Sequence, residues 1–94
     1  MGKYEEIYSH EGWIVRFSGR LHTDGTWDDS ADLEFHDAGT VRGVPLIGNN
    51  KFAYKDEAIR VTMTFARQWI DSKGMDFLNE KRQQEARNYL DTSQ

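Results

Sequence analysis

The most constraining feature of the sequence is the stretch from Gly12 to Phe35, in which large apolar residues alternate with polar ones. An alternation with a period of two is typical of β-strands that bury one face, because successive side chains of a strand point to opposite sides of the sheet. The residues Thr23, Asp24 and Gly25 separate the two alternating arms. The stretch therefore predicts a β-hairpin with one apolar face and one charged face.

The apolar residues also predict the register of this hairpin. A two-residue Asp24-Gly25 loop would pair odd with even positions and turn the apolar face of one arm towards water. A three-residue loop, with Gly25 in the left-handed conformation, keeps odd positions opposite odd ones. The resulting pairs are Leu21 with Trp27, Phe17 with Ala31, Val15 with Leu33 and Trp13 with Phe35 on one face, and Arg20 with Asp28, Ser18 with Ser30 and Arg16 with Asp32 on the other. We expect each opposite-charge pair to contribute about 0.2–1 kcal/mol.

The segments on either side of the hairpin predict a further strand and a long connection. Tyr and Ile residues between positions 4 and 8 indicate a first strand, with a turn near residues 10–12. Between residues 37 and 51, several glycines and Pro45 favour a loop. A short fourth strand at residues 44–47 is the alternative interpretation of this loop.

A change of period at Lys55 predicts a helix that ends near Asp71. Apolar residues recur there at steps of three and four, which is the pattern of a helix packed on a sheet. Gly74 is predicted to stop this helix, and the polar segment from Met75 to Leu90 to form a second one. The predicted core consists of Trp13, Phe17, Leu21, Leu33, Phe35, Phe65 and Trp69.

These elements predict an α+β fold: a three- or four-stranded antiparallel sheet with one amphipathic helix packed on its apolar face, plus a polar C-terminal helix. Residues 1–74 form the predicted sheet-plus-helix domain, and residues 75–94 form a C-terminal helical extension.

The charge of the chain is unevenly distributed. Residues 1–54 contain five Lys or Arg against nine Asp or Glu, whereas residues 55–94 are balanced at seven against seven. Because a phosphate backbone is bound by clustered cations, an acidic sheet argues against nucleic acid as a partner. The absence of cysteine, of a leader and of a long apolar run is typical of a cytoplasmic protein without membrane contact.

The histidines do not predict a metal site. In the predicted register His22 lies beside the turn and His36 at the far end of the hairpin, more than about 13 Å apart. These two residues therefore cannot share an ion within one chain, and His10 completes no ligand set. We expect no metal and no cofactor.

Acidic residues are concentrated in the hairpin, where Asp28, Asp32 and Glu34 share the polar face. Two arginines lie opposite them and no calcium-loop pattern is present, so we interpret this group as a solvated acidic face. Asp29 is the exception, because its position places it on the apolar side. We expect the Asp29 carboxylate to reach solvent near the turn. The less favoured alternative is a buried carboxylate, whose pKa burial would raise.

The sequence contains no Gly-x-Ser-x-Gly elbow, no phosphate-binding P-loop and no dinucleotide glycine motif. The leading hypothesis is therefore a non-catalytic protein-interaction module that associates with itself as a homodimer. The candidate contact residues are Phe77, Leu78, Tyr89 and Leu90 of the C-terminal helix and Leu46 and Ile47 of the preceding loop. The alternative is an acidic inhibitor or antitoxin-like protein that presents Asp28, Asp32 and Glu34 to a basic protein partner. An enzyme whose site is assembled from distant residues is a third hypothesis.

The phrase FAYKDEAIRVTMTFARQWIDSKG, residues 52–74, has an aromatic residue before the first helical turn and Arg-Gln-Trp-Ile-Asp near its end. It resembles a small bacterial domain of hypothetical proteins, and this resemblance extends over residues 4–74 but implies no activity. The order of three strands followed by a helix is also similar to HicB-type antitoxins, whose partial ribonuclease-H-like domain binds a toxin. The present chain departs from that family in lacking a basic DNA-binding segment after the helix. Neither resemblance assigns a functional residue.

Overall fold

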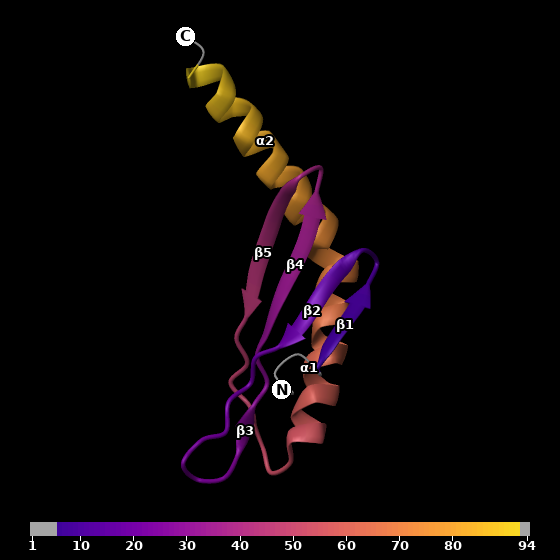
Figure 1. Cartoon of the computed structure of the whole chain (residues 1–94), viewed down its shortest axis with the longest axis vertical. Coiled ribbons are helices and arrows are strands. Elements are labelled where there is room, and N and C mark those ends of the chain that lie inside the picture. Colours follow the sequence, from indigo (N-terminus) through magenta and orange to yellow (C-terminus); the bar gives the residue numbers. More distant parts are fainter. Residues whose placement is uncertain (1–5, 93–94) are drawn as a thin grey trace.

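The computed structural model describes residues 6–92 of the chain, and the side chains of residues 6–88. It shows an α+β fold in which a four-stranded antiparallel sheet, in the order β1-β2-β4-β5, packs against a long helix (Figure 1). The elements are β1 (Ile7–His10), β2 (Trp13–Phe17), β3 (Trp27–Asp28), β4 (Ala31–Asp37), β5 (Thr40–Leu46), β6 (Lys51–Phe52), α1 (Lys55–Trp69), the π-helical turn η1 (Ile70–Gly74) and α2 (Met75–Thr92). Over residues 6–92, no helix is both long and apolar enough to cross a membrane.

The predicted register of the hairpin is confirmed. The apolar pairs are Trp13 with Phe35, Val15 with Leu33, Phe17 with Ala31 and, as an isolated bridge, Leu21 with Trp27. Gly25 has a φ of 86°, which is the left-handed conformation that the three-residue turn requires. The regular ladder ends at Phe17, because β3 turns away to pair with β6.

The connection after β4 contains a complete strand, β5, where the sequence favoured a loop and gave a short strand at residues 44–47 as the alternative. Ala38 and Gly39 form a two-residue turn with φ values of 50° and 88°, and Thr40 pairs with Asp37 directly after it. β5 lies at the edge of the sheet. The loop prediction was wrong because an edge strand tolerates glycine and proline that a central strand does not.

The helix continues through Gly74, so the predicted helix end at this residue is wrong. Gly74 is buried, and a Cβ atom at this position would lie 3.2 Å from Nε1 of Trp13. The glycine therefore allows the helix to approach the sheet closely instead of ending the helix in a left-handed conformation.

A single stripe of the helix faces the sheet over the whole docked length. Met63 is buried beside this stripe, and six buried positions of the stripe follow each other at steps of four: Ala58, Thr62, Ala66, Ile70, Gly74 and Leu78. In an α-helix such a row rotates by about 40° per step around the axis. The π-helical turn from Ile70 to Gly74 holds an extra residue per turn and so rotates the stripe back towards the sheet. Leu78, which belongs to the predicted extension of residues 75–94, is part of this stripe.

The core is centred on Trp13, which is 2% exposed. Its ring packs against Phe35, Trp69 and Phe77, with centroids 5.3, 5.6 and 6.1 Å away. The predicted core residue Phe65 is exposed, because small side chains occupy the sheet side of α1 and Phe65 lies about 100° around the helix from Ala66.

Leu21 is the second incorrectly predicted core residue. It is 59% exposed. The reason is its position beyond the end of β2, where only an isolated bridge to Trp27 continues the pairing.

Candidate interaction surface

The described part of the helix covers one face of the four-stranded sheet and leaves the other face open (Figure 1). The covered face carries Trp13, Val15 and Leu33. Because side chains alternate along a strand, the pairing register assigns the remaining positions to the open face. These positions are Ile7, Ser9, Ile14, Arg16, Asp32, Glu34, His36, Val41, Gly43 and Pro45.

A groove of about 360 Å³ lies over β4 and β5 on this open face. Asp32 and Glu34 of β4 and Val41 and Pro45 of β5 line it. Gly43 lies between the two β5 residues in the sequence and has no side chain, which leaves the centre of the groove unfilled.

A second cavity, the sheet-end hollow, has a volume of about 420 Å³ and lies at the end of β5. It is lined by apolar Pro45, Leu46 and Ile47 and by acidic Asp28 and Asp32, among other residues. Ile47 is 77% exposed. Since Asp32 and Pro45 line both cavities, the groove and the hollow adjoin each other. The structure thus brings the two candidate contact residues of the loop next to two residues of the acidic face.

The acidic face is partly neutralised by the chain itself. Arg16 forms an ion pair with Glu34, its diagonal neighbour, although Asp32 lies directly opposite as predicted. The hydrogen bond from Arg16 lowers the pKa of Glu34, and Nε2 of His36 lies 3.4 Å from the second Glu34 oxygen. Asp32 is exposed and forms no ion pair with the described residues. This carboxylate is therefore available to a cation from a partner.

Asp28 is held by the loop that follows β2. Nε2 of His22 lies 2.8 Å from Oδ2 of Asp28, and the backbone N–H of Arg20 donates to Oδ1 at 3.3 Å. The predicted ion pair between the side chains of Arg20 and Asp28 is absent from the contacts of the described residues. Partial burial raises the pKa of Asp28, but hydrogen bonds from His22 and Ser30 outweigh this effect and keep the pKa below its usual value.

The geometry of His22, Asp28 and Ser30 differs from that of a nucleophilic triad. The imidazole of His22 bonds to the carboxylate of Asp28, and among the described residues no hydrogen bond joins the imidazole to Ser30. A serine nucleophile needs the imidazole beside its hydroxyl as a base. Ser30 Oγ also accepts a hydrogen bond from the backbone N–H of Gly48 at 3.3 Å, so these groups connect the two loops that border the hollow.

Asp29 is a buried carboxylate, and the predicted escape to solvent is wrong. It is 6% exposed and accepts hydrogen bonds from the backbone N–H of Asn50 at 3.2 Å and from its Nδ2 at 3.0 Å. A Cβ atom on Gly48 would meet Oδ1 of Asp29 at 1.9 Å. The loop after β5 thus supplies the polar partners that a buried carboxylate needs, and this contact also positions the neighbouring Ile47.

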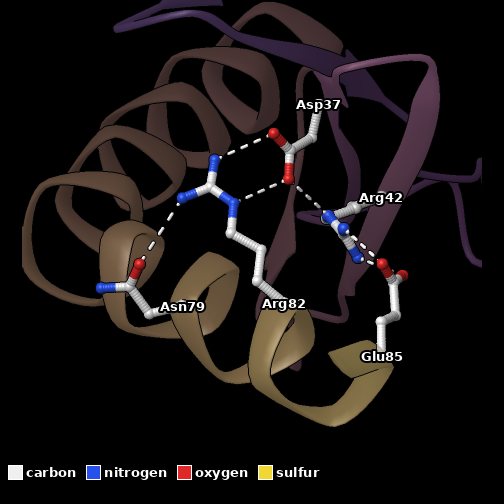
Figure 2. Close-up of polar contacts among 5 residues, drawn as sticks. All are labelled: Asp37, Arg42, Asn79, Arg82 and Glu85. Atoms are coloured by element: carbon white, nitrogen blue, oxygen red, sulfur yellow. Dashed lines mark hydrogen bonds and ion pairs between the residues drawn. The ribbon is translucent and has the colours of Figure 1, made fainter. Parts of the chain in front are cut away.

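Four charged residues form an anchor cluster that joins α2 to the tip of the β4–β5 hairpin: Asp37, Arg42, Arg82 and Glu85 (Figure 2). Arg42, whose side chain is 8% exposed, donates from Nη1 and Nη2 to Glu85 at 2.7 and 2.9 Å, and from Nε to Asp37 at 2.9 Å. Arg82 donates from Nε and Nη2 to Asp37 at 2.8 and 2.9 Å. Bidentate pairs of this kind fix orientation as well as distance. The C-terminal helix therefore docks on its own chain as far as Glu85.

The anchor cluster makes the docking of α2 sensitive to acid. Hydrogen bonds from Arg82 and Arg42 lower the pKa of Asp37 from 3.8 to about 2. A carboxylate with a lowered folded-state pKa stabilises the fold above its unfolded pKa and loses this contribution as the pH falls through the folded value. We therefore expect the melting temperature to fall between about pH 4 and pH 2 more steeply for the native chain than for Asp37→Asn, measured by circular dichroism. Equal slopes for the two proteins would contradict this prediction.

The predicted contact residues of the C-terminal helix fall into two pairs. Leu78 is 3% exposed, and the ring of Phe77 lies 5.9 Å from that of Trp69, so both residues pack inside the chain's own fold. Tyr89 and Leu90 lie outside the residues whose side chains are described. The C-terminal part of α2 projects past the tip of the β4–β5 hairpin (Figure 1).

Each histidine contacts a different carboxylate. Nε2 of His10 lies 2.7 Å from Oδ1 of Asp71, while His22 and His36 contact the two acidic residues already described. Among the described side chains, no group of three or more His, Asp or Glu residues is placed to hold a metal ion.

Comparisons of the chain with protein-family models, with curated proteins and with solved structures found no match. The resemblances to a bacterial hypothetical-protein domain and to HicB-type antitoxins therefore stay predictions.

Proposed function

We propose that this protein is a non-catalytic protein-interaction module that binds its partner on the open side of β4 and β5. The observation that carries this proposal is the continuous surface formed by the groove and the sheet-end hollow. It combines the exposed Ile47 and the partly buried Leu46 with the available carboxylate of Asp32. An apolar contact point bordered by polar residues is typical of protein interfaces. The lack of cysteine is consistent with the cytoplasmic location that we propose.

The docked α2 helix supports this choice of surface. Phe77 and Leu78 were candidate contacts because the sequence predicted few apolar neighbours for the tail within its own domain, but both residues pack against the core. The anchor cluster also holds the tip of the β4–β5 hairpin against α2. A surface held in this way loses little conformational freedom when a partner binds.

Binding peptides selected against the protein tests this function. Short random peptides displayed on phage are selected against the full chain, and their affinities are then measured for two variants, Ile47→Asp and Phe65→Asp. Both residues are exposed and apolar, but Phe65 lies on α1, away from the proposed surface. We expect Ile47→Asp to weaken binding by at least about tenfold, as for a central contact, and Phe65→Asp to have no effect. Failure to enrich any peptide, or the opposite pattern for the two variants, would contradict the proposal.

The same two variants test whether the partner is a second copy of the chain. A homodimer that uses this surface dissociates when Ile47 becomes Asp, and stays intact when Phe65 becomes Asp. Light scattering over a range of protein concentrations measures the molar mass in each case. A dimer that is lost only in the Phe65 variant would place self-association on the helix.

A second candidate function is supported by the exposed carboxylate of Asp32 and by the acidic excess of residues 1–54, which hold five basic residues against nine acidic ones. In this function, the chain is an acidic inhibitor or antitoxin-like protein that binds a basic protein surface. Because complementary charges are screened by ions, such binding weakens as salt is added. An affinity that does not change with salt concentration would exclude it.

A further inference from the structure

The outer edge of β5 carries main-chain groups without partners among the described residues. Asp37 and Thr40 close a two-residue turn, so this pair and every second pair after it are hydrogen-bonded between β4 and β5. The intervening residues Val41, Gly43 and Pro45 therefore direct their main-chain groups away from β4. Since β5 is the last strand of the sheet, the N–H and C=O groups of Val41 and Gly43 and the C=O of Pro45 are available to an added strand.

The side chains beside this edge are small enough for a long Lys or Arg side chain of a partner to lie across β5. Gly43 has no side chain, and the ring of Pro45 is short. Beyond them, on β4, lies the exposed carboxylate of Asp32, which has no ion pair within the described chain. Neighbouring strands lie about 5 Å apart, so an added strand is about 10 Å from β4. The apolar stem of a Lys or Arg on that strand can lie over Gly43 and bring its charge to Asp32.

We infer that β5 binds an extended, basic segment of a partner protein as a fifth strand of the sheet. The main chain of the segment pairs with Val41 and Gly43, and one of its Lys or Arg side chains reaches Asp32. An apolar side chain further along the segment enters the sheet-end hollow beside Ile47. This inference rests on the proposed function and specifies how the partner is recognised, namely by strand addition with a charge contact.

Charge complementarity favours a basic segment of another protein over a second copy of this chain. A second β5 strand would present Val41, Gly43 and Pro45 again, and none of them is a cation. Its Arg42 points to the covered face, where Asp37 and Glu85 hold it. Pro45 of the second copy would also lack the N–H that the pairing needs. A basic segment of another protein satisfies both the carboxylate and the main-chain groups.

The test uses a synthetic peptide with blocked ends in which Lys and Val alternate, so that Lys occupies the open face of the added strand. Calorimetry measures its affinity for the full chain at low and at physiological salt. The control peptide has the same sequence with N-methyl groups at the residues that pair with β5, which removes the main-chain donors. Two variants complete the design: Asp32→Asn, and Asp56→Asn as a matched exposed carboxylate on α1.

We expect N-methylation to weaken binding by at least about tenfold, because two or more hydrogen bonds are lost. Asp32→Asn should weaken binding by about two- to fivefold, as for one exposed ion pair, and Asp56→Asn should leave it unchanged. Equal affinity for the two peptides would overturn strand addition. If this peptide fails to bind while selected peptides still depend on Ile47, strand addition is wrong and the interaction function stands. If neither kind of peptide binds, both proposals are wrong.

Discussion

Replacing Trp13 by alanine is expected to lower the free energy of unfolding by about 3–5 kcal/mol, which is the range for removing a large buried aromatic side chain. Trp13 is 2% exposed and contacts aromatic rings from both β4 and the helix, among them Phe35, Trp69 and Phe77. It also packs against Gly74, whose missing side chain makes room for the indole ring. The cavity left by the substitution lies between the helix and the sheet, so the loss affects both layers.

Ile14→Ala is the matched control for this prediction. Ile14 is the next residue of β2, and its side chain lies on the open face, where it is only half-buried. We expect it to cost less than half of the Trp13 value, because less apolar area returns to water. Urea unfolding followed by tryptophan fluorescence measures both values, from two tryptophans in Trp13→Ala and from three in Ile14→Ala. Equal destabilisation by the two substitutions would contradict the assignment of covered and open faces.

The second large effect is expected for Arg42→Gln, which breaks the anchor cluster. Arg42 is the residue that binds both Asp37 and Glu85, so its removal frees Glu85 and leaves only the hydrogen bonds from Arg82 to Asp37 between α2 and the hairpin tip within the anchor cluster. A helical end without tertiary contacts is marginally stable in water. We expect trypsin to cleave the native-state helix after Arg82 and Arg87 faster by about an order of magnitude, because cleavage follows local opening.

Arg60→Gln provides the comparison, since Arg60 is an exposed residue of α1 outside the anchor cluster. This variant should show the cleavage rate of the native chain at α2. Mass spectrometry of short digests identifies the cleavage sites. An unchanged rate for Arg42→Gln would show that the Arg82–Asp37 hydrogen bonds and the apolar contacts of Leu78 are sufficient to hold the helix in place.

The local pattern of the sequence was sufficient to predict the hairpin, because alternation and turn length act over neighbouring residues. Trp13 opposite Phe35 and the left-handed Gly25 follow from this argument alone. The same local argument failed at Gly74, where a glycine that usually ends a helix instead allows close contact with a residue sixty-one positions earlier in the chain.

The candidate surface was only partly predictable. Ile47 and Asp32 were candidates from the sequence, but their proximity around one hollow depends on how β5 pairs with β4. The anchor cluster gave no local signal, since Asp37 and Arg82 are separated by 45 residues. Asp29 was placed on the correct face, yet its burial depends on Asn50, a partner 21 residues away.

The sequence by itself determined the type of each layer and the register of the hairpin formed by β2 and β4. These properties arise from side-chain periodicity and turn stereochemistry, which neighbouring residues set. Only the tertiary structure decided that β5 is an edge strand, that the helix continues through Gly74, and that Arg16 pairs with Glu34 while Asp32 stays available. The physical reason is that these outcomes depend on which distant groups meet after folding, and packing and electrostatic pairing between such groups have no period along the chain.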